Sequence, residues 1–204
     1  MAAPDLGDWD PLSPGELAHT LAPVRARWWL AGGWALDLFL GRETRAHDDI
    51  DVQILRPEHL RVRSALAAWD AHAAEPAGTL RPWPVDEELP PGVHDIWCRR
   101  SSADPWAFQL MIADTAGGDW VYRRDPRIRR PLAELSGPTS TRAMQVLSPD
   151  IQLLYKSKAL RPKDQQDFDA VLPALTTIQR RWLRTALTTA APGHPWLHAL
   201  RDAG

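Results

Sequence analysis

The stretch that decides the fold covers residues 28–52 and reads WWLAGGWALDLFLGRETRAHDDIDV. It begins with an apolar run typical of a strand and continues through a Gly32-Gly33 turn into a short amphipathic helix. It ends where Asp49-Ile50-Asp51 opens a second strand. Because residues two apart in a strand point to the same face, Asp49 and Asp51 are predicted to project side by side, opposite Ile50.

This carboxylate pair predicts a bound cation. Two unit charges about 4 Å apart repel by roughly 4 kcal/mol at an effective dielectric near 20, so the pair is most stable with a divalent ion between its members. One or two carboxylates together with substrate phosphates are the ligands that Mg²⁺ prefers. Upstream, Gly32 and Gly33 let a phosphate approach the backbone, and the helix after them offers free N–H groups. Together these residues predict a site for a metal-bound nucleotide.

The bulk properties are those of a globular protein. The chain has 204 residues, 44% of them hydrophobic and 25% charged, which is enough to bury a core in one domain or two small ones. A formal net charge of -2 does not by itself demand a nucleic-acid partner. Cys98 is the single cysteine, which excludes an internal disulfide and fits a reducing compartment. No apolar run approaches the ~20 residues that span a bilayer, and the acidic start lacks a signal peptide's basic region, so a cytoplasmic location is expected.

Patterning and caps predict an order of elements that mixes strands and helices. Helices are expected at 14–25, 33–40, 57–69, 148–160, 162–173 and 176–189, and strands at 28–31, 50–55, 79–85, 93–99, 106–113, 120–123 and 144–147. Ser13 is the expected cap of the first helix, and Gly41 is expected to end the second. From residue 148 the pattern becomes wholly helical. We therefore predict a catalytic α/β domain over residues 1–147 and a helical subdomain over 148–204.

The same stretch resembles a known group of enzymes, the aminoglycoside 2″-adenylyltransferase-like family of the DNA polymerase β-like nucleotidyltransferase superfamily. The matching residues are Gly32-Gly33-Trp34-Ala35, Asp37, Gly41-Arg42, Thr44-Arg45 and His47-Asp48-Asp49-Ile50-Asp51. A later segment, 153–158 followed by 163–168, looks like the helical part of related enzymes. The resemblance covers about a third of the chain.

The resemblance implies an α+β nucleotidyltransferase fold, in which a mixed sheet is flanked by helices and followed by a C-terminal helical part. It also implies Mg²⁺-dependent transfer of a nucleoside monophosphate, by default AMP from ATP, to a hydroxyl of a small acceptor such as an aminoglycoside-like antibiotic. In that reaction Asp49 and Asp51 hold Mg²⁺ and are the catalytic carboxylates, and the backbone of Gly32 and Gly33 holds phosphates.

Three basic residues complete the expected nucleotide site. Arg45 is expected either to meet phosphate or to pair with a carboxylate. A lysine on the later helix adds a point charge to the triphosphate: Lys156 is the first choice and Lys158 the second. Two residues lie ~200° apart around a helix when they are two positions apart, so only one of these lysines can face the site.

The chain departs from the family at the third carboxylate, which serves there as metal ligand or base. The strand aligned with it carries Gln109, which cannot take a proton. Asp114 lies five residues further and points to the other face of a regular strand, and Asp95 on the neighbouring strand is another candidate. The base, and whether one metal or two are bound, therefore stay open.

Other readings also stay open. The arginines of 123–130 are either a patch for an anionic acceptor such as RNA, or surface residues that are solvated or paired with carboxylates. A toxin-type enzyme acting on tRNA or protein is therefore an alternative. Gln109 motivates a second alternative, a non-catalytic nucleotide-binding protein. Asp37 is expected to pair with Arg42 or Arg45, and Asp164 and Asp167 are expected to cap their helix in solvent. The acceptor and the oligomeric state cannot be read from the sequence.

Overall fold

The computed structural model describes residues 6–76, 78–138 and 144–201. The chain forms two compact units. Unit 1 comprises Met1–Leu30 and His47–Thr115, and unit 2 comprises Ala31–Ala46 and Ala116–Gly204. The chain therefore passes from unit 1 to unit 2 and back within the deciding stretch.

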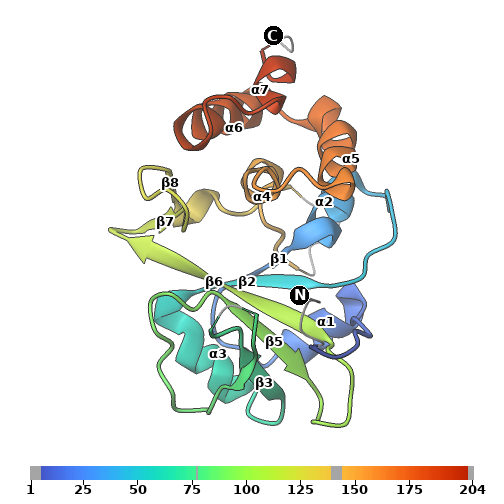
Figure 1. Cartoon of the computed structure of the whole chain (residues 1–204), viewed down its shortest axis with the longest axis vertical. Coiled ribbons are helices and arrows are strands. Elements are labelled where there is room, and N and C mark those ends of the chain that lie inside the picture. The colour runs from blue at the N-terminus through green and yellow to red at the C-terminus, as the bar shows by residue number, and fades with distance from the viewer. Residues whose placement is uncertain (1–5, 77, 139–143, 202–204) are drawn as a thin grey trace. The chain divides into compact units, whose positions relative to one another are not determined.

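Unit 1 is built on a mixed sheet (Figure 1). Its strands follow the order β1-β2-β6-β5-β3-β4. Their bounds are β1 Trp28–Ala31, β2 Asp51–Leu55, β3 Asp70–Ala73, β4 Arg81–Pro82, β5 Asp95–Arg99 and β6 Phe108–Ala116. Strand β2 runs parallel to β6, whereas β6, β5, β3 and β4 pair antiparallel in turn. The predicted mixed sheet is confirmed.

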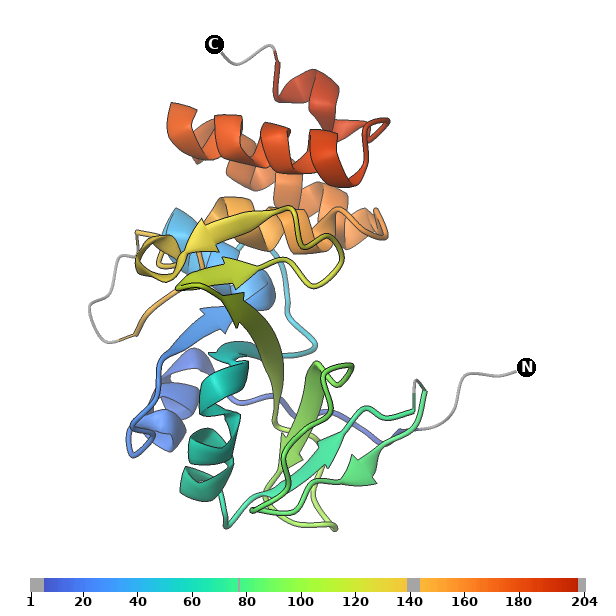
Figure 2. The ribbon, with the colours of Figure 1, turned by 90° about the vertical axis from the view of Figure 1, so that its left-hand side faces the viewer.

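One face of this sheet carries the core of unit 1. Val52 on β2, Leu110 on β6, Ile96 on β5 and Ala73 on β3 face one another in register and are fully buried. The helices α1 (Pro14–Leu21) and α3 (His59–Ala65), with the 3-10 turn η1 (Arg56–Glu58) before α3, lie together on one side of the strands (Figure 2). Ser13 caps α1 through a capping box, as predicted.

Unit 2 is mainly helical (Figure 1). It contains α2 Gly32–Leu40, the hairpin of β7 Asp119–Val121 and β8 Arg129–Pro131, η2 Leu132–Glu134, α4 Pro149–Lys156, α5 Pro162–Val171, η3 Leu172–Ala174, α6 Thr177–Ala190 and α7 Trp196–Ala199. Helix α4 contacts α2, α5 and α6 and has seven buried residues out of eight, so it is the central helix of this unit. Gly41 ends α2 in the left-handed conformation with φ 69°, as predicted.

Several predicted elements differ from the structure. The helix expected over 57–69 ends at Ala65, because the chain turns there to enter β3, a strand the sequence did not predict. The strand expected over 79–85 is reduced to Arg81–Pro82. Residues 144–147 form no strand, but Val146 and Leu147 are bridge residues, and Leu147 pairs antiparallel with Ser136. Short strands and bridges of this kind depend on tertiary partners more than on local propensity.

The predicted boundary between an α/β domain ending at residue 147 and a helical subdomain starting at residue 148 stays a prediction, since the two compact units are defined by contacts and not by independent folding. None of the helices in the described part of the chain is long and apolar enough to cross a membrane.

Candidate functional site

A row of polar and aromatic side chains crosses the second face of the unit 1 sheet. Asp51 on β2 lies opposite Gln109 on β6, Gln109 lies opposite Trp97 on β5, and Trp97 lies opposite His72 on β3. All four are partly exposed, in contrast to the buried residues that alternate with them. Because residues in register share a face, this side of the sheet presents Asp51 to solvent.

Asp49 lies just before β2. The strand begins at Asp51, yet the N–H of Gln109 donates to the carbonyl of Ile50, so the pairing extends one residue further. Ile50 is buried while Asp49 and Asp51 are partly exposed. This alternation agrees with two aspartates on one face, and the metal role of the pair stays a prediction.

Gln109 connects this row to a further carboxylate. Its Nε2 donates to Oδ1 of Asp95 at 3.0 Å. Asp95 lies opposite Met111, two residues along β6 from Gln109, so it belongs to the same face. Neighbouring strands are about 4.8 Å apart and residues rise about 3.3 Å along a strand, so two strand spacings and a two-residue offset put the backbones of Asp51 and Asp95 about 12 Å apart across β6. Asp95 is therefore too far away to share an ion directly with Asp51 but lies on the same surface.

Asp114 is engaged elsewhere. It lies within β6 and forms an ion pair with Arg56, whose guanidinium also donates to the carbonyl of Val93 at 2.9 Å. His94 approaches the same carboxylate, with its Nε2 3.8 Å from Oδ2. These contacts hold Asp114 against Arg56, which follows β2, and His94, which precedes β5.

The donor set fits a magnesium ion that a nucleotide brings with it. Within residues 6–76, 78–138 and 144–201, no group of three or more His, Cys, Asp or Glu side chains is arranged to hold a metal. A closed protein cage is thus missing from that part of the chain. Mg²⁺ commonly takes only one or two carboxylates, with phosphate oxygens and water completing the octahedron. Asp49 and Asp51 supply hard oxygen donors of this kind.

The diglycine is not a separate turn, as the sequence had suggested, but the first two residues of α2. Ala31, the last residue of β1, is the N-cap and makes no side-chain hydrogen bond there. Gly32 has φ 68°, a left-handed conformation that favours glycine. The chain therefore passes from strand to helix without a loop, and this is possible because Gly32 has no Cβ.

The N–H of Gly32 is already used inside unit 2. It donates to Oε1 of Gln152 at 2.9 Å, and Gln152 lies on α4 with only 3% of its surface exposed. That the backbone of Gly32 and Gly33 holds phosphates stays a prediction, and at Gly32 the N–H already has an acceptor within the protein. The N–H of Gly33 has no intrahelical acceptor, because the first turn of a helix lacks one.

Asp37 holds the loop that follows its own helix, and its predicted pairing with Arg42 or Arg45 stays a prediction. Its Oδ1 accepts hydrogen bonds from the backbone N–H of Thr44 at 3.2 Å and from the Thr44 hydroxyl at 2.6 Å. Only 3% of Asp37 is exposed. The buried carboxylate thereby ties the loop after α2 back onto the helix.

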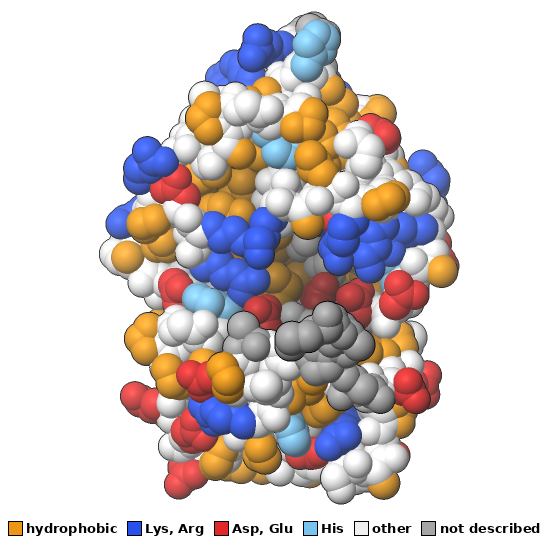
Figure 3. All heavy atoms as spheres, viewed as in Figure 1, with side chains coloured by type: hydrophobic (Ala, Val, Ile, Leu, Met, Phe, Trp, Pro, Cys, Tyr) orange, Lys and Arg blue, Asp and Glu red, His pale blue; other side chains and the backbone are white. Residues whose placement is uncertain are grey.

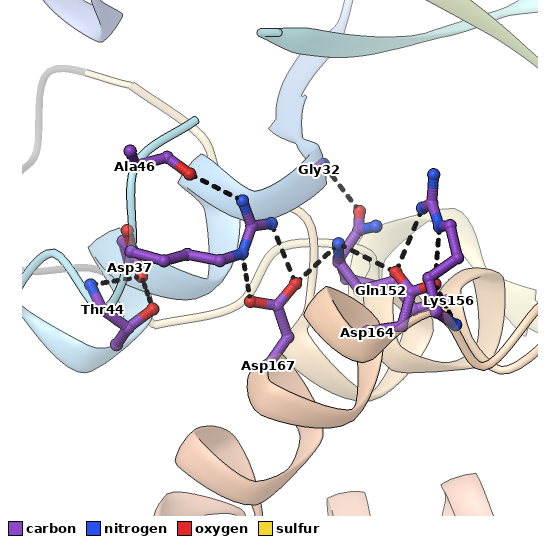
Figure 4. A network of polar contacts seen from close by, with 10 residues as sticks. Gly32, Asp37, Thr44, Ala46, Gln152, Lys156, Asp164 and Asp167 are labelled. Atoms are coloured by element: carbon purple, nitrogen blue, oxygen red, sulfur yellow. Dashed lines mark hydrogen bonds and ion pairs between the residues drawn. The ribbon is translucent and has the colours of Figure 1, made fainter. Parts of the chain in front are cut away.

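A buried ion-pair network follows this loop (Figure 4). Asp167 on α5 binds Arg45 through two contacts, Nε to Oδ1 at 2.9 Å and Nη2 to Oδ2 at 3.0 Å. Lys156 on α4 places its Nζ 2.7 Å from the same Oδ2 and 3.7 Å from Oδ1 of Asp164. Asp164 in turn pairs with Arg161. Of the two outcomes predicted for Arg45, the structure has the carboxylate pair.

The prediction that Asp164 and Asp167 are solvated is wrong, since they are 0% and 2% exposed. Burial raises the pKa of the Asp167 carboxyl, but the hydrogen bonds from Arg45 and Lys156 outweigh burial and leave that pKa below its ordinary value. The pKa of Asp164 is lowered in the same way, with burial opposed by the hydrogen bond from Arg161. Both groups are therefore ionised within the fold at neutral pH.

The structure also separates the two candidate lysines. Lys156 ends α4 and is buried, with 8% of its side chain exposed. Lys158 lies beyond the end of the helix and is exposed. Only Lys156 thus takes part in the network, and the phosphate-binding role of either lysine stays a prediction.

The arginines of 123–130 do not form one solvated patch. Arg130 is buried, pairs with Asp150 at 2.7 Å and lies over the ring of Trp182 at 4.7 Å. Arg127 pairs with Asp125 at 2.6 Å. Part of this cluster therefore stabilises unit 2, which is the second of the two readings offered by the sequence.

Sequence reasoning missed Gln152 and the burial of Asp167. A signal existed for both. Gln152 and Lys156 are four residues apart on α4 and so share a helix face. Asp164 and Asp167 are spaced three apart, on the same face as the buried Phe168 and Val171. Polar residues repeated on an apolar helix face indicate a buried polar network.

The chain is similar to several solved structures. The lincosamide antibiotic adenylyltransferase LnuA, solved with lincomycin bound, aligns with a TM-score of 0.55 at 16% identity, over 81% of this chain and 100% of that chain. ANT(2″)-Ia, solved in complex with adenylyl-2″-tobramycin, aligns at 21% identity over 93% of this chain and 92% of that one, with a TM-score of 0.47. An antigenic nucleotidyltransferase-like protein from Paracoccidioides brasiliensis aligns at 19% identity over 95% of both chains, with a TM-score of 0.47. A search of curated proteins gives no match.

The mixed sheet with its helices and C-terminal helical segment is the fold that this chain shares with LnuA. The family model described as aminoglycoside-2″-adenylyltransferase matches residues 16–171, which is more than half of the chain. That span contains the diglycine helix, both aspartates of the Asp-x-Asp motif, the row across the sheet and the ion-pair network. The chain therefore belongs to the aminoglycoside-2″-adenylyltransferase family.

Proposed function

We propose that this protein is a Mg²⁺-dependent adenylyltransferase that moves AMP from ATP to a hydroxyl of a small, positively charged acceptor of the antibiotic type. The observation that carries the proposal is the exposed face of the unit 1 sheet. It presents Asp51 in register with Gln109 and, through Gln109, the carboxylate of Asp95. Membership of an adenylyltransferase family supplies ATP as the expected donor.

Groups suited to this reaction occur in both units. In unit 1, Asp49 and Asp51 would hold Mg²⁺, which supplies charge neutralisation of the triphosphate when bound. In unit 2, the first turn of α2 offers the N–H of Gly33 at the positive end of a helix dipole. The network of Arg45, Lys156 and Arg161 against Asp164 and Asp167 leaves one positive charge in excess, which favours an anionic ligand.

The reaction joins the acceptor oxygen to the α-phosphorus of ATP and breaks the bond from that phosphorus to the bridging oxygen, so pyrophosphate leaves. The acceptor hydroxyl loses its proton in this step. We assign Asp95 as the group that takes it, because it is a carboxylate on the same face as Asp51 and Gln109 orients it through a hydrogen bond. The neutral Gln109 itself cannot accept the proton.

Formal charge divides sharply between the units. Unit 1 has 16 Asp and Glu against 8 Arg, a net charge of -8, whereas unit 2 has 10 Asp and Glu against 16 Lys and Arg, a net charge of +6. Lys and Arg side chains are gathered over unit 2 on the face drawn in Figure 3. Fields of this kind steer ligands of opposite charge. Taken separately, the negative charge of unit 1 favours a cationic acceptor, and the positive charge of unit 2 favours an anionic ligand such as a triphosphate.

The direct test is transfer of labelled AMP. Purified protein is incubated with Mg²⁺ and α-labelled ATP against a panel of cationic, neutral and anionic hydroxylated antibiotics, with unfractionated tRNA as a separate arm. Label is expected on cationic small molecules, with release of one pyrophosphate per label. Transfer to tRNA alone would replace the proposal with the toxin-type function. Binding of Mg²⁺-ATP without transfer to any acceptor would favour a non-catalytic nucleotide-binding protein.

The role of Asp95 has its own expected result. The Asp95→Asn variant removes the proton acceptor but keeps the hydrogen-bonding shape, so kcat should fall by about a hundredfold or more, the usual contribution of a general base. Affinity for Mg²⁺-ATP should stay within about twofold of the native value, because Asp95 is not a metal ligand in this assignment. Calorimetry and steady-state rates measure the two quantities separately.

Asp104→Asn is the matched control for Asp95→Asn, since Asp104 lies in the turn between β5 and β6 and accepts a hydrogen bond from the exposed Ser101 in that turn. Its kcat should equal the native value. A comparable loss in both variants, or a loss of nucleotide affinity in Asp95→Asn, would show that Asp95 does not act as the base.

A further inference from the structure

The start of α2 is held by a side chain from a distant helix. Gln152 lies 120 residues after Gly32, is almost completely buried, and accepts the Gly32 N–H at 2.9 Å. Side-chain caps of helix N-termini normally come from the residue that precedes the helix. Here Ala31 occupies that position and has no group that can cap. Gln152 therefore replaces the missing local cap from outside the helix.

This contact fixes a residue with unusual backbone freedom. Gly32 is in the left-handed conformation, and a glycine can leave that conformation at little cost. If Gly32 rotates, the peptide that follows it rotates too, and the N–H of Gly33 changes direction. The hydrogen bond to Gln152 restricts this rotation. Gln152 can restrict the rotation of Gly32 because its side chain is buried on a packed helix and has little freedom to move.

The same helix face carries the network that holds Arg45. Gln152 and Lys156 are one turn apart on α4, and Lys156 binds the Asp167 carboxylate that holds Arg45 (Figure 4). Helix α4 thus contacts both ends of the segment Ala31–Ala46, at Gly32 directly and at Arg45 through Asp167. Both contacts lie within unit 2.

We infer that Gln152 is a positioning residue for the nucleotide. By taking the Gly32 N–H and fixing the left-handed conformation of Gly32, it leaves the N–H of Gly33 as the backbone group directed at phosphate. This inference rests on the proposed function, because it assigns the support of the phosphate-binding turn. It also explains how Gly32 contributes without contacting phosphate itself.

The test compares Gln152→Leu with the native protein by two measurements. The first is hydrogen exchange of the Gly32 amide followed by NMR, which needs no ligand. Exchange should accelerate at least tenfold in Gln152→Leu and stay slow in Gln152→Glu, which keeps an acceptor oxygen. The second is calorimetric binding of Mg²⁺-ATP without acceptor, where Gln152→Leu should raise Kd about tenfold.

Two controls separate positioning from general destabilisation. Gln145→Leu makes the same chemical change at an exposed glutamine and should alter neither measurement. Leu187→Ala destabilises the protein by weakening the packing of α6 at a fully buried position. The folded fraction of this variant should bind Mg²⁺-ATP with native affinity. Rates measured with an accepted substrate should show the Gln152→Leu effect mainly in KM for ATP rather than in kcat.

The outcomes are distinct. If the native protein binds Mg²⁺-ATP and Gln152→Leu binds it with the same affinity, the positioning role is overturned and the proposed function stays intact. Slow exchange of the Gly32 amide in Gln152→Leu would show that the hydrogen bond to Gln152 does not protect this amide, and it would overturn the positioning role. Absence of Mg²⁺-ATP binding in the native protein would overturn the proposed function and this inference with it.

Discussion

Replacing Asp51 with asparagine is expected to lower the rate of AMP transfer by about a thousandfold, because a lost metal ligand removes several kcal/mol of charge stabilisation and each 1.36 kcal/mol is a tenfold change in rate. The amide has nearly the shape of the carboxylate, so the strand pairing of Asp51 with Gln109 should survive. Asp49→Asn should behave alike. The measurement is single-turnover transfer of labelled AMP to an acceptor identified with the native protein.

The neighbouring residue provides the control for this experiment. Asp48 is exposed and sits next to the motif, so Asp48→Asn changes the same charge at almost the same place. Its rate should stay within a few fold of the native rate. Activity within tenfold of native in both Asp49→Asn and Asp51→Asn would contradict the assignment of these carboxylates to the metal.

The second large effect concerns stability. Asp167→Asn is expected to lower the free energy of unfolding by about 3–5 kcal/mol, the usual cost of removing one partner from a buried ion pair. The amide would leave the charges of Arg45 and Lys156 without the carboxylate that now contacts both at 3.0 Å or less. Urea unfolding followed by tryptophan fluorescence measures the change at pH 7.

The same helix offers the control for Asp167→Asn. Asp169 is exposed and accepts a hydrogen bond from Gln165 at 2.8 Å. Asp169→Asn should change stability by no more than about 0.5 kcal/mol, as is usual for surface positions. Equal effects of the two substitutions would mean that the buried network contributes little.

The lowered pKa of Asp167 gives this prediction a pH dependence. A carboxyl group whose pKa is lower in the folded protein than in the unfolded chain stabilises the fold fully above the unfolded value. That contribution is lost as the pH falls through the folded pKa, which lies below the ordinary aspartate value of 3.8. The stability difference between the native protein and Asp167→Asn should therefore be largest near neutral pH and shrink below pH ~4.

Much of the fold could be predicted because strong local signals agree with tertiary structure. The strand Trp28–Ala31, the helix ending at Gly41 and the capped helix after Ser13 are where the sequence predicts them. Each has a physical marker that acts over a few residues: an apolar run, a left-handed glycine or a capping box. The weaker elements, such as β3, β8 and α7, lack such markers and depend on pairing or packing with distant residues.

The candidate site divides in the same way. The sequence identifies Asp49, Asp51, Gly32 and Gly33 as chemically special, because paired carboxylates and paired glycines are informative without any knowledge of the fold. It could not show that Gln109 lies opposite Asp51 or that its amide reaches Asp95, since both facts depend on the register between strands far apart in the chain.

The sequence by itself thus predicted which residues would carry the chemistry, and it determined the family to which the chain belongs. Only the tertiary structure decided which partners these residues contact. The Gly32 N–H donates to Gln152, and Arg45 and Lys156 both bind the buried carboxylate of Asp167. The reason is that a hydrogen bond or an ion pair depends on distances of a few ångströms. Over separations of 120 or 122 residues, only the packing of α4 and α5 can set those distances.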